Sequence, residues 1–275
     1  MRNCRGLPTS VLPYSSRLIF MDSRVRISKE RLDRLLVTQG LVASREVAAR
    51  TILAGGVIVD GAIVDKPAKL VPPDARIEIE KPAPYVSRSG EKLAAALEAF
   101  SIDPNGVIGL DVGCSTGGFT DCLLQRGAKR IYAVDVGYGQ IDWKLRQDPR
   151  VVLLERTNIR HIDRTLIPEP IELAVIDVSF ISLTLVMPSV VPLLRGDATV
   201  VVLVKPQFEV GKGQVGTGGI VRDDAQREAV TKKVIDCGAR LGLQVQSVLD
   251  SPVKGRKGNR EILVSFRRQG IINPS

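Results

Sequence analysis

Apolar and polar positions of residues 89–268 follow the pattern of short buried strands separated by amphipathic helices. The expected strands lie at 107–111, 130–135, 151–155, 173–177, 199–204, 244–250 and 261–266. This alternation is typical of an α/β domain with a doubly wound, mostly parallel seven-stranded sheet. Ligands of such sheets bind beyond the carboxyl ends of the strands.

A shorter pattern precedes this domain, at residues 26–81. Its apolar positions predict one helix that stops at Gly40 and a second helix that Ser44 caps. Asp60-Gly61 predicts a tight hairpin turn, and a closing strand is expected at 76–80. Together these elements form a small α+β module near the lower size limit for independent folding.

The remaining segments carry loop and turn residues. Pro82 and Pro84 stiffen a linker, and the first 25 residues are rich in Ser, Pro and Arg. We interpret them as a disordered tail or as residues ahead of a start codon at Met21, with a transit peptide as an open alternative. The expected division is a tail at 1–25, the small module at 26–81, a linker at 82–88, the larger domain at 89–268 and a tail at 269–275.

Charge is unevenly distributed. The net charge is +9, and residues 1–90 hold 15 Lys or Arg against 9 Asp or Glu. A basic module beside a nearly balanced domain suits an enzyme with a polyanion-binding attachment, although solubility alone also explains such a surplus. Four cysteines without metal-ligand spacing and a single histidine predict reduced thiols and no metal site. Reduced thiols suit a cytoplasmic protein, and without a long apolar stretch we expect no membrane crossing. We also expect a monomer.

Basic side chains of the small module lie off its apolar positions. If they converge on one face, they would contact phosphates of a folded RNA; the alternative is a solvated helix surface. The predicted RNA contacts, which include the linker and two later loops, are Arg31, Arg34, Arg45, Arg50, Lys66, Lys69, Arg88, Lys212, Arg256 and Lys257. The "SR" before the second helix and the "GGVIVDG" after it resemble the αL RNA-binding module of a small-subunit ribosomal protein, pseudouridine synthases and tyrosyl-tRNA synthetases.

The turn "LDVGCSTGGFT" at residues 110–120 is the main chemical motif. Ser115 breaks the glycine spacing of a dinucleotide site, and the turn lacks the lysine of a P-loop. Asp111 would repel phosphate and attract a cation, and Asp135 is placed to bind ribose hydroxyls. S-adenosylmethionine fits both features. Its predicted contacts are Asp111, Gly113, Ser115, Gly117, Gly118, Phe119, Asp135, Asn158 and Asp177.

Residues after the fourth and fifth strands indicate the methyl acceptor. Amino-directed enzymes of this fold commonly carry an Asn-Pro-Pro-Tyr-like motif, where this chain has "DVSF", and no cysteine is placed to attack a base. A hydroxyl acceptor remains, and it needs a base. Lys205 follows the fifth strand directly. Together with Lys92, Asp177 and Glu261 it forms a predicted catalytic Lys-Asp-Lys-Glu set.

This set resembles that of FtsJ-like ribose 2′-O-methyltransferases. The segments "VSRSGEKL", "DVGCSTGGFTDCLLQRGA", "DVSFISL", "VKPQFEVGK" and "GNREIL" resemble the TlyA family, often labelled hemolysin A. The resemblance implies a Rossmann-like class I methyltransferase that uses S-adenosylmethionine to methylate the ribose 2′-hydroxyl of cytidine in ribosomal RNA, with Lys205 as base. A membrane-active protein and a non-catalytic RNA-binding or ribosome assembly factor are the alternatives.

Overall fold

The computed structural model describes residues 28–53, 55–79, 83–211, 217–255 and 258–269. Contacts divide the chain into two compact units, of which the first ends at Pro82 and the second begins at Ala83. The predicted tail at 1–25 lies outside the described residues, as do Lys212, Arg256 and Lys257.

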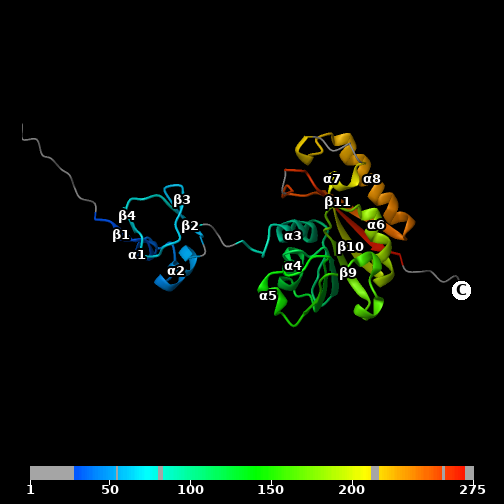
Figure 1. Ribbon diagram of the computed structural model, residues 1–275, viewed down its shortest axis with the longest axis horizontal. Helices are drawn as coiled ribbons and strands as arrows, with labels where there is room; N and C mark the ends of the chain where they lie inside the picture. Colours follow the sequence, from blue (N-terminus) through cyan, green and yellow to red (C-terminus); the bar gives the residue numbers. More distant parts are fainter. Residues whose placement is uncertain (1–27, 54, 80–82, 212–216, 256–257, 270–275) are drawn as a thin grey trace, which may run out of the picture. The chain divides into compact units, whose positions relative to one another are not determined.

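The first unit packs two helices with two small antiparallel sheets (Figure 1). Its elements are β1 (Glu30–Arg31), α1 (Leu32–Thr38), α2 (Arg45–Leu53), β2 (Val57–Val59), β3 (Ala62–Ile63), β4 (Leu70–Val71) and β5 (Ile77–Ile79). β2 pairs with both β3 and β5, and β1 pairs with β4. Leu32, Leu36 and Ile52 are fully buried in its core.

Local signals in the sequence explain the ends of these elements. The Ser44 hydroxyl accepts a hydrogen bond from the Val47 amide at 3.3 Å, which confirms the predicted cap of α2. Asp60 and Gly61 have φ of 50° and 81°, the left-handed conformation that a two-residue hairpin turn requires. The predicted hairpin is therefore confirmed, with Val59 paired to Ala62.

The second unit contains the seven-stranded sheet, in the order β11-β12-β10-β9-β6-β7-β8. Its strands are β6 (Ile108–Val112), β7 (Arg130–Val134), β8 (Val151–Leu154), β9 (Ile171–Ile176), β10 (Leu194–Val204), β11 (Leu243–Asp250) and β12 (Ile262–Arg268). The adjacent strands β10, β9, β6, β7 and β8 run parallel to one another, whereas β12 runs antiparallel to β10 and β11. The predicted mostly parallel sheet is confirmed.

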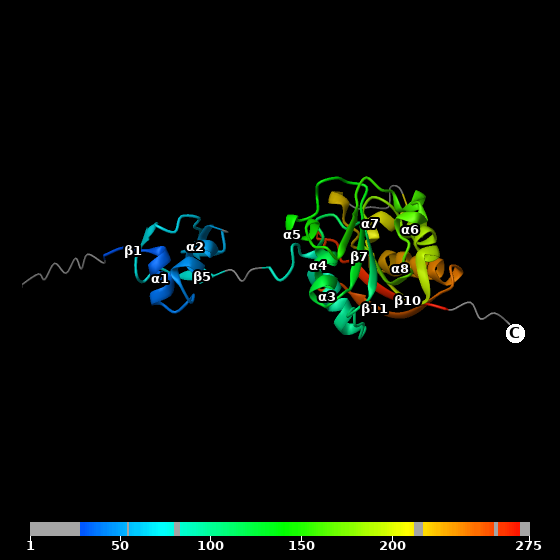
Figure 2. The same ribbon diagram turned by 90° about the horizontal axis from the view of Figure 1, so that it is seen from below.

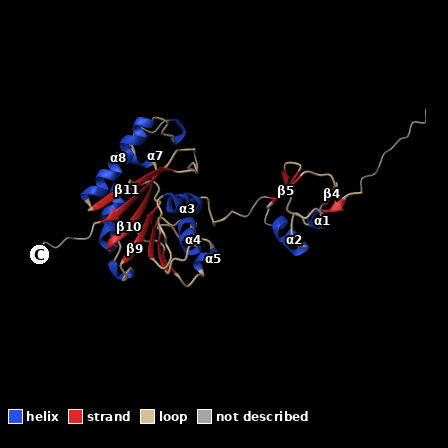
Figure 3. Cartoon of the chain, turned by 180° about the vertical axis from the view of Figure 1, so that it is seen from behind, coloured by secondary structure: helices blue, strands red, loops and turns tan. Residues whose placement is uncertain are grey.

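Helices cover both faces of this sheet (Figures 2 and 3). They are α3 (Ser89–Ala99), α4 (Gly118–Gln125), α5 (Trp143–Arg146), α6 (Leu183–Val190), α7 (Pro206–Glu209) and α8 (Asp224–Arg240), with short 3₁₀ turns η1 (Ile159–His161), η2 (Arg164–Leu166), η3 (Val191–Leu193) and η4 (Thr217–Gly219). α3 and α4 contribute to one apolar cluster, and α6 and α8 to the cluster on the opposite face.

The strand order creates a switch point between β6 and β9. The chain proceeds from β6 outward to β7 and β8, and then returns to the other side of β6 to form β9 and β10. Loops that leave β6 and β9 therefore diverge at the carboxyl edge of the sheet. Doubly wound sheets bind ligands at this position.

The described part of the expected linker, residues 83–88, is attached to α4. The Gln125 side chain donates from Nε2 to the Pro84 carbonyl at 2.9 Å, and the Val86 backbone amide donates to the Asp121 carboxylate at 2.8 Å. The Tyr85 hydroxyl accepts a hydrogen bond from Arg126 at 2.7 Å. These bonds make this segment a structural part of the second unit.

Because the two units have separate cores, a cavity in the first should destabilise that unit alone. We expect Leu36→Ala to lower its free energy of unfolding by about 2–5 kcal/mol, most of what a unit of this size has. Calorimetry of the full chain would show the transition of the first unit lowered or lost and the second unchanged. Leu53→Ala, at a side chain that is 67% exposed, is the matched control. An equal effect of both substitutions would contradict the assignment of this core.

Candidate active site

The Gly-rich turn links the carboxyl end of β6 to α4, and its glycines make room for neighbouring parts of the protein. Gly113 has a φ of +82°, and a Cβ there would lie 2.6 Å from the Asp177 carbonyl oxygen. Gly117 has a φ of +92°, and its Cβ would lie 2.3 Å from Leu145 Cδ1. Ser115 and Thr116 are the exposed residues of the turn. The turn therefore packs against the protein through Gly113 and Gly117 and exposes Ser115 and Thr116 to solvent.

Gly118 and Phe119, both predicted to contact the cofactor, face the interior of the protein. A Cβ at Gly118 would lie 2.1 Å from the Ser89 hydroxyl oxygen and 2.3 Å from that of Ser87. Phe119 is 2% exposed and packs in the apolar cluster beneath α3 and α4. The structure gives both residues packing roles, so their predicted cofactor contact has no exposed surface to support it.

Asp111 lies under the turn and is fully buried. Its Oδ2 accepts hydrogen bonds from the Thr120 amide at 3.0 Å and the Thr120 hydroxyl at 2.7 Å, which tether the first turn of α4. Its Oδ1 is buried without a hydrogen-bond partner among the described residues. Burial raises the pKa of Asp111 to about 7, because removing the carboxylate from water disfavours its charged form.

Asp135 and Asn158 follow the next two strands, β7 and β8. Asp135 accepts the Ser115 amide at 2.8 Å on Oδ2 and the Gly137 amide at 2.7 Å on Oδ1, so it joins the Gly-rich turn to the loop after β7. Asn158 is exposed, and its Oδ1 accepts the Arg160 amide at 3.1 Å and caps η1. Since β6, β7 and β8 are neighbours, the turn, Asp135 and Asn158 lie along one edge of the sheet.

The four predicted catalytic residues form two ion pairs. Lys92, in the first turn of α3, contacts Glu261 at 2.5 Å, with 10% and 3% of the two side chains exposed. Lys205 contacts Asp177 at 2.5 Å, with 11% and 15% exposed, and donates to the Ser179 hydroxyl at 2.9 Å. A largely buried charge requires such a partner.

Strand pairing brings the two ion pairs to the same edge. Val204 of β10 pairs with Ile262 of β12, so Lys205, which follows Val204, and Glu261, which precedes Ile262, occupy adjacent positions. The Asp177 amide donates to the Val112 carbonyl at 3.0 Å, which places Asp177 beside the Gly-rich turn. The predicted set therefore extends from that turn across β9, β10 and β12.

Sequence reasoning did not identify Phe180 as part of this site. Its side chain is 90% exposed, and its φ of +65° is unusual for a residue with a large side chain. The ring centroid lies 5.0 Å from that of Phe208, in the segment after Lys205. An exposed aromatic ring three residues after Asp177 therefore lies close to a ring three residues after Lys205. The sequence did offer a sign of this ring. The "DVSF" segment stands where amino-directed enzymes carry an Asn-Pro-Pro-Tyr-like motif, so an aromatic residue ends both segments.

Asn259 was also missed. It is 2% exposed; its side-chain amide donates to the Gly219 carbonyl at 2.9 Å, and its Oδ1 accepts the Val221 amide at 2.9 Å. A Cβ at Gly255 would lie 2.5 Å from Glu261 Oε1. Asn259 thus connects the segment before α8 to the loop that carries Glu261. A buried asparagine in a Gly- and Lys-rich loop has no distinguishing sequence pattern.

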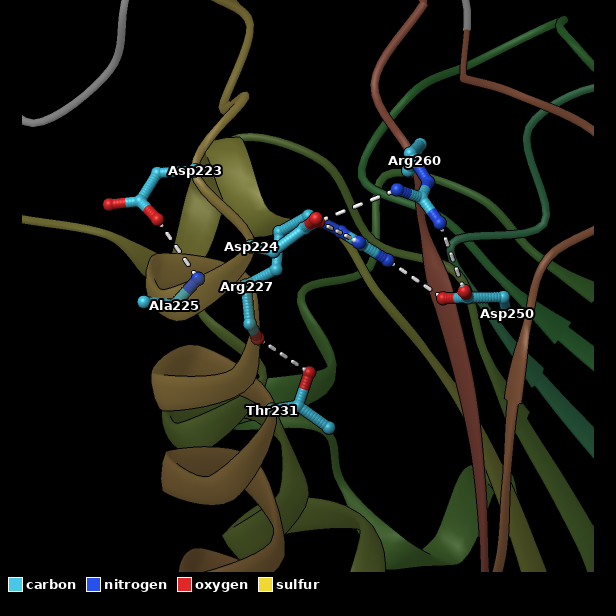
Figure 4. Close-up of polar contacts among 7 residues, drawn as sticks. All are labelled: Asp223, Asp224, Ala225, Arg227, Thr231, Asp250 and Arg260. Atoms are coloured by element: carbon cyan, nitrogen blue, oxygen red, sulfur yellow. Dashed lines mark hydrogen bonds and ion pairs between the residues drawn. The ribbon is translucent and has the colours of Figure 1, made fainter.

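A cluster of charged side chains lies where α8 meets the end of β11, near the loop that carries Glu261 (Figure 4). Arg227, whose side chain is 9% exposed, bridges Asp224 at 2.6 Å and Asp250 at 2.7 Å. Arg260, adjacent to Glu261, lies 3.4 Å from both carboxylates. A cleft of about 500 Å³ lies between α8 and the strands β11 and β12, and Arg227 and Arg260 line it. This cluster anchors the end of β11, from which the loop to Glu261 begins.

The predicted RNA contacts of the first unit differ in their surroundings. Arg34, Arg50, Lys66 and Lys69 are exposed, as is Arg88 in the second unit. Arg31 and Arg45 both form ion pairs with Asp33.

The chain matches known families over both units. Residues 85–268 match the model described as FtsJ-like methyltransferase, and residues 30–77 match the S4 domain. TlyA of Mycobacterium tuberculosis (strain ATCC 25618 / H37Rv), a 16S/23S rRNA (cytidine-2′-O)-methyltransferase, is 46% identical over 243 residues, which cover 88% of this chain and 91% of TlyA. YqxC of Bacillus subtilis (strain 168) is 46% identical over 244 residues, covering 88% and 87%.

A solved structure of a protein named as a hemolysin from Streptococcus thermophilus has a TM-score of 0.67 at 41% identity and covers 90% of this chain and 92% of that chain. In the part of the chain that the structure describes, no helix is long and apolar enough to cross a membrane. The chain therefore belongs to the FtsJ-like methyltransferase family and carries an S4 domain ahead of its methyltransferase domain.

Proposed function

We propose that this protein transfers a methyl group from S-adenosylmethionine to the ribose 2′-hydroxyl of cytidine in ribosomal RNA. The observation that carries the proposal is the row formed by the Gly-rich turn, the Lys205–Asp177 pair and the Lys92–Glu261 pair at one sheet edge. The activity of the similar TlyA supports the nucleotide and the RNA class. A cytoplasmic monomer stays a prediction.

The residues around the turn suit the cofactor. Asp111 is fully buried, so its carboxylate would attract a nearby cation without touching it, and the exposed Ser115 lies beside Asp135, a carboxylate suited to ribose hydroxyls. Gly113, Asn158 and Asp177 complete the proposed contacts. When bound there, S-adenosylmethionine would supply an electrophilic methyl group on a positively charged sulfur.

The chain's own residues would then position the acceptor and remove its proton. Lys205 would accept the proton of the 2′-hydroxyl on its side-chain nitrogen as the hydroxyl oxygen takes the methyl group, which leaves S-adenosylhomocysteine as the second product. Asp177 and Ser179 hold the Lys205 nitrogen at a fixed place. Glu261 orients Lys92 at the same edge of the sheet, where its ammonium would stabilise negative charge that develops on the sugar oxygen.

The base role predicts a large loss on removal of the Lys205 nitrogen. Lys205→Ala should lower the methylation rate by about 10²–10⁴-fold, since this is the usual contribution of a positioned general base. Lys205→Arg keeps the positive charge but cannot accept a proton, so we expect a similar loss. The measurement is mass spectrometry of 2′-O-methylcytidine in ribosomal RNA from subunits incubated with each variant and S-adenosylmethionine.

Lys129→Ala is the control, because this exposed lysine precedes β7 at the opposite edge of the sheet. Calorimetry should show that the Lys205 variants still bind S-adenosylmethionine. Full methylation by Lys205→Arg would remove Lys205 from the base role. Failure of the wild-type protein to bind the cofactor, with or without RNA, would instead favour a non-catalytic assembly factor.

Asp111 predicts how cofactor affinity depends on pH. Its pKa of about 7 means that the carboxylate gains its charge as the pH rises through neutrality, and only the charged form attracts a sulfonium. The ratio of S-adenosylmethionine to S-adenosylhomocysteine affinity should therefore rise from about pH 6 to pH 8. S-adenosylhomocysteine lacks the positive charge on sulfur, so the ratio of the two affinities measures the contribution of that charge alone. Calorimetry would measure it, and Asp111→Asn should abolish the rise.

Phe180 predicts a contact with a nucleobase. An exposed ring close to the segment after the proposed base residue offers a stacking surface for the target nucleotide, worth about 1–3 kcal/mol, or roughly 5- to 150-fold in affinity. We expect Phe180→Ala to raise the KM for ribosomal subunits by that factor and to leave the Kd for S-adenosylmethionine unchanged. Phe180→Tyr should retain stacking. Leu166→Ala, at an exposed apolar residue ahead of β9, is the control. An unchanged KM for Phe180→Ala would exclude this contact.

A further inference from the structure

Two arginines from different elements of the first unit meet at one buried carboxylate. Arg31 donates from Nε to Asp33 Oδ1 at 3.0 Å and from Nη2 to Oδ2 at 2.8 Å. Arg45, the first residue of α2, donates from Nη2 to Asp33 Oδ2 at 2.9 Å. The Asp33 side chain is 5% exposed, whereas those of Arg31 and Arg45 are 43% and 53% exposed. The hydrogen bonds from Arg31 hold the pKa of Asp33 well below its usual range.

This arrangement leaves part of each guanidinium for another partner. A guanidinium carries five N–H donors, and within the described residues Asp33 receives two from Arg31 and one from Arg45. The remaining donors belong to side chains that are about half exposed. A buried ion pair needed only for stability would have no reason to leave both cations at the surface.

Backbone contacts bring two further cations to the same place. The Leu32 amide donates to the Lys69 carbonyl at 2.9 Å, and the Asp33 amide donates to the Pro67 carbonyl at 3.0 Å. In the β1–β4 ladder, Arg31 pairs with Leu70. The segment that carries the exposed Lys66 and Lys69 therefore runs alongside the start of α1. The backbone that carries Lys66 and Lys69 thus lies beside the residues that hold Asp33, while the carboxylate itself is paired with Arg31 and Arg45.

We infer that Asp33 is a positioning residue, which holds Arg31 and Arg45 as a paired clamp for neighbouring phosphates of the RNA backbone. The inference rests on the proposed function and adds that the first unit, the S4 domain whose basic side chains the sequence predicts to contact RNA, docks ribosomal RNA. A free arginine loses side-chain freedom when it binds a phosphate. Asp33 fixes both guanidinium planes during folding, so that binding loses less entropy and the spacing of the two cations is set in advance.

Asp33→Asn separates this role from a general charge effect, because the two predict opposite changes. The substitution makes the module more positive by one charge, and charge alone would tighten RNA binding. Loss of the clamp geometry instead predicts binding about tenfold weaker. The measurement is filter binding of the full chain to deproteinised ribosomal RNA at several salt concentrations. Asp74→Asn, at an exposed carboxylate of the same unit, makes the same charge change and should bind at least as tightly as the wild type.

A double-mutant cycle distinguishes positioning from loss of folding. Arg31→Ala combined with Arg45→Ala should weaken binding by more than Asp33→Asn does and reduce the salt slope by about two. Adding Asp33→Asn to that pair should change affinity by less than twofold, because no arginine remains to be positioned. A loss caused by unfolding would persist in this background and would overturn the inference.

A further variant covers the case in which Asp33→Asn does not fold. Arg31→Lys combined with Arg45→Lys keeps every charge but replaces the guanidinium forks with single ammonium groups, and we expect binding about tenfold weaker. Unchanged affinity would overturn the clamp. If the alanine variants weaken binding but Asp33→Asn does not, the arginines contact RNA and Asp33 does not position them. A wild-type protein that binds RNA but does not methylate it would contradict the proposed function and leave these affinities interpretable.

Discussion

The antiparallel pairing of β12 with β10 is the constraint on which the candidate active site depends. Glu261 precedes β12, so it lies at the amino end of that strand. In a sheet whose other strands present their carboxyl ends to the ligand, the amino end of a strand reaches the same edge only if that strand runs the opposite way. The register of Val204 with Ile262 therefore brings Glu261 beside Lys205 and gives Lys92 its partner.

The turn before α4, which is the proposed cofactor site, packs closely against neighbouring parts of the protein. Its glycines suggested from sequence a backbone that a ligand approaches closely. In the structure, Gly113 accommodates the carbonyl of Asp177, Gly117 accommodates Leu145, and Gly118 accommodates serines at the start of α3. Three segments thus press on the turn from within the protein. Substitution of these glycines would displace the turn even if no cofactor atom touched them.

The strands and the class of fold could be predicted from the sequence, whereas the ion-pair partners of the lysines could not. Strand positions follow from local apolar runs, and β6 to β10 begin or end within a few residues of expectation, except that β10 starts at Leu194, ahead of the predicted Thr199. The partners of Lys92 and Lys205 could not be assigned, because they depend on strand order and on contacts between residues as far apart as 169 positions.

Asp111 and Arg31 show the same limit in other ways. Helices cover both faces of the sheet, so Leu110, Asp111 and Val112 are all buried, and alternation along β6 gives no indication of which side chain meets a ligand. The charge pattern of the first unit placed Arg31 and Arg45 among free surface cations. Their shared partner Asp33 became visible only when α1 and α2 were packed together.

Carboxylates orient cations in both units, but the exposure of the cations separates two tasks. The arginines paired with Asp33 are about half exposed, so they remain accessible to a long polyanion that passes over the surface. Lys92 and Lys205 are about nine-tenths buried, so a phosphate backbone that passes over the surface meets little of either ammonium group. Any RNA group that contacts them must enter the site, and a single nucleotide displaced from its neighbours is small enough to do so. In the proposed function, the division between docking and chemistry would therefore follow burial, with a carboxylate–cation pair in each role.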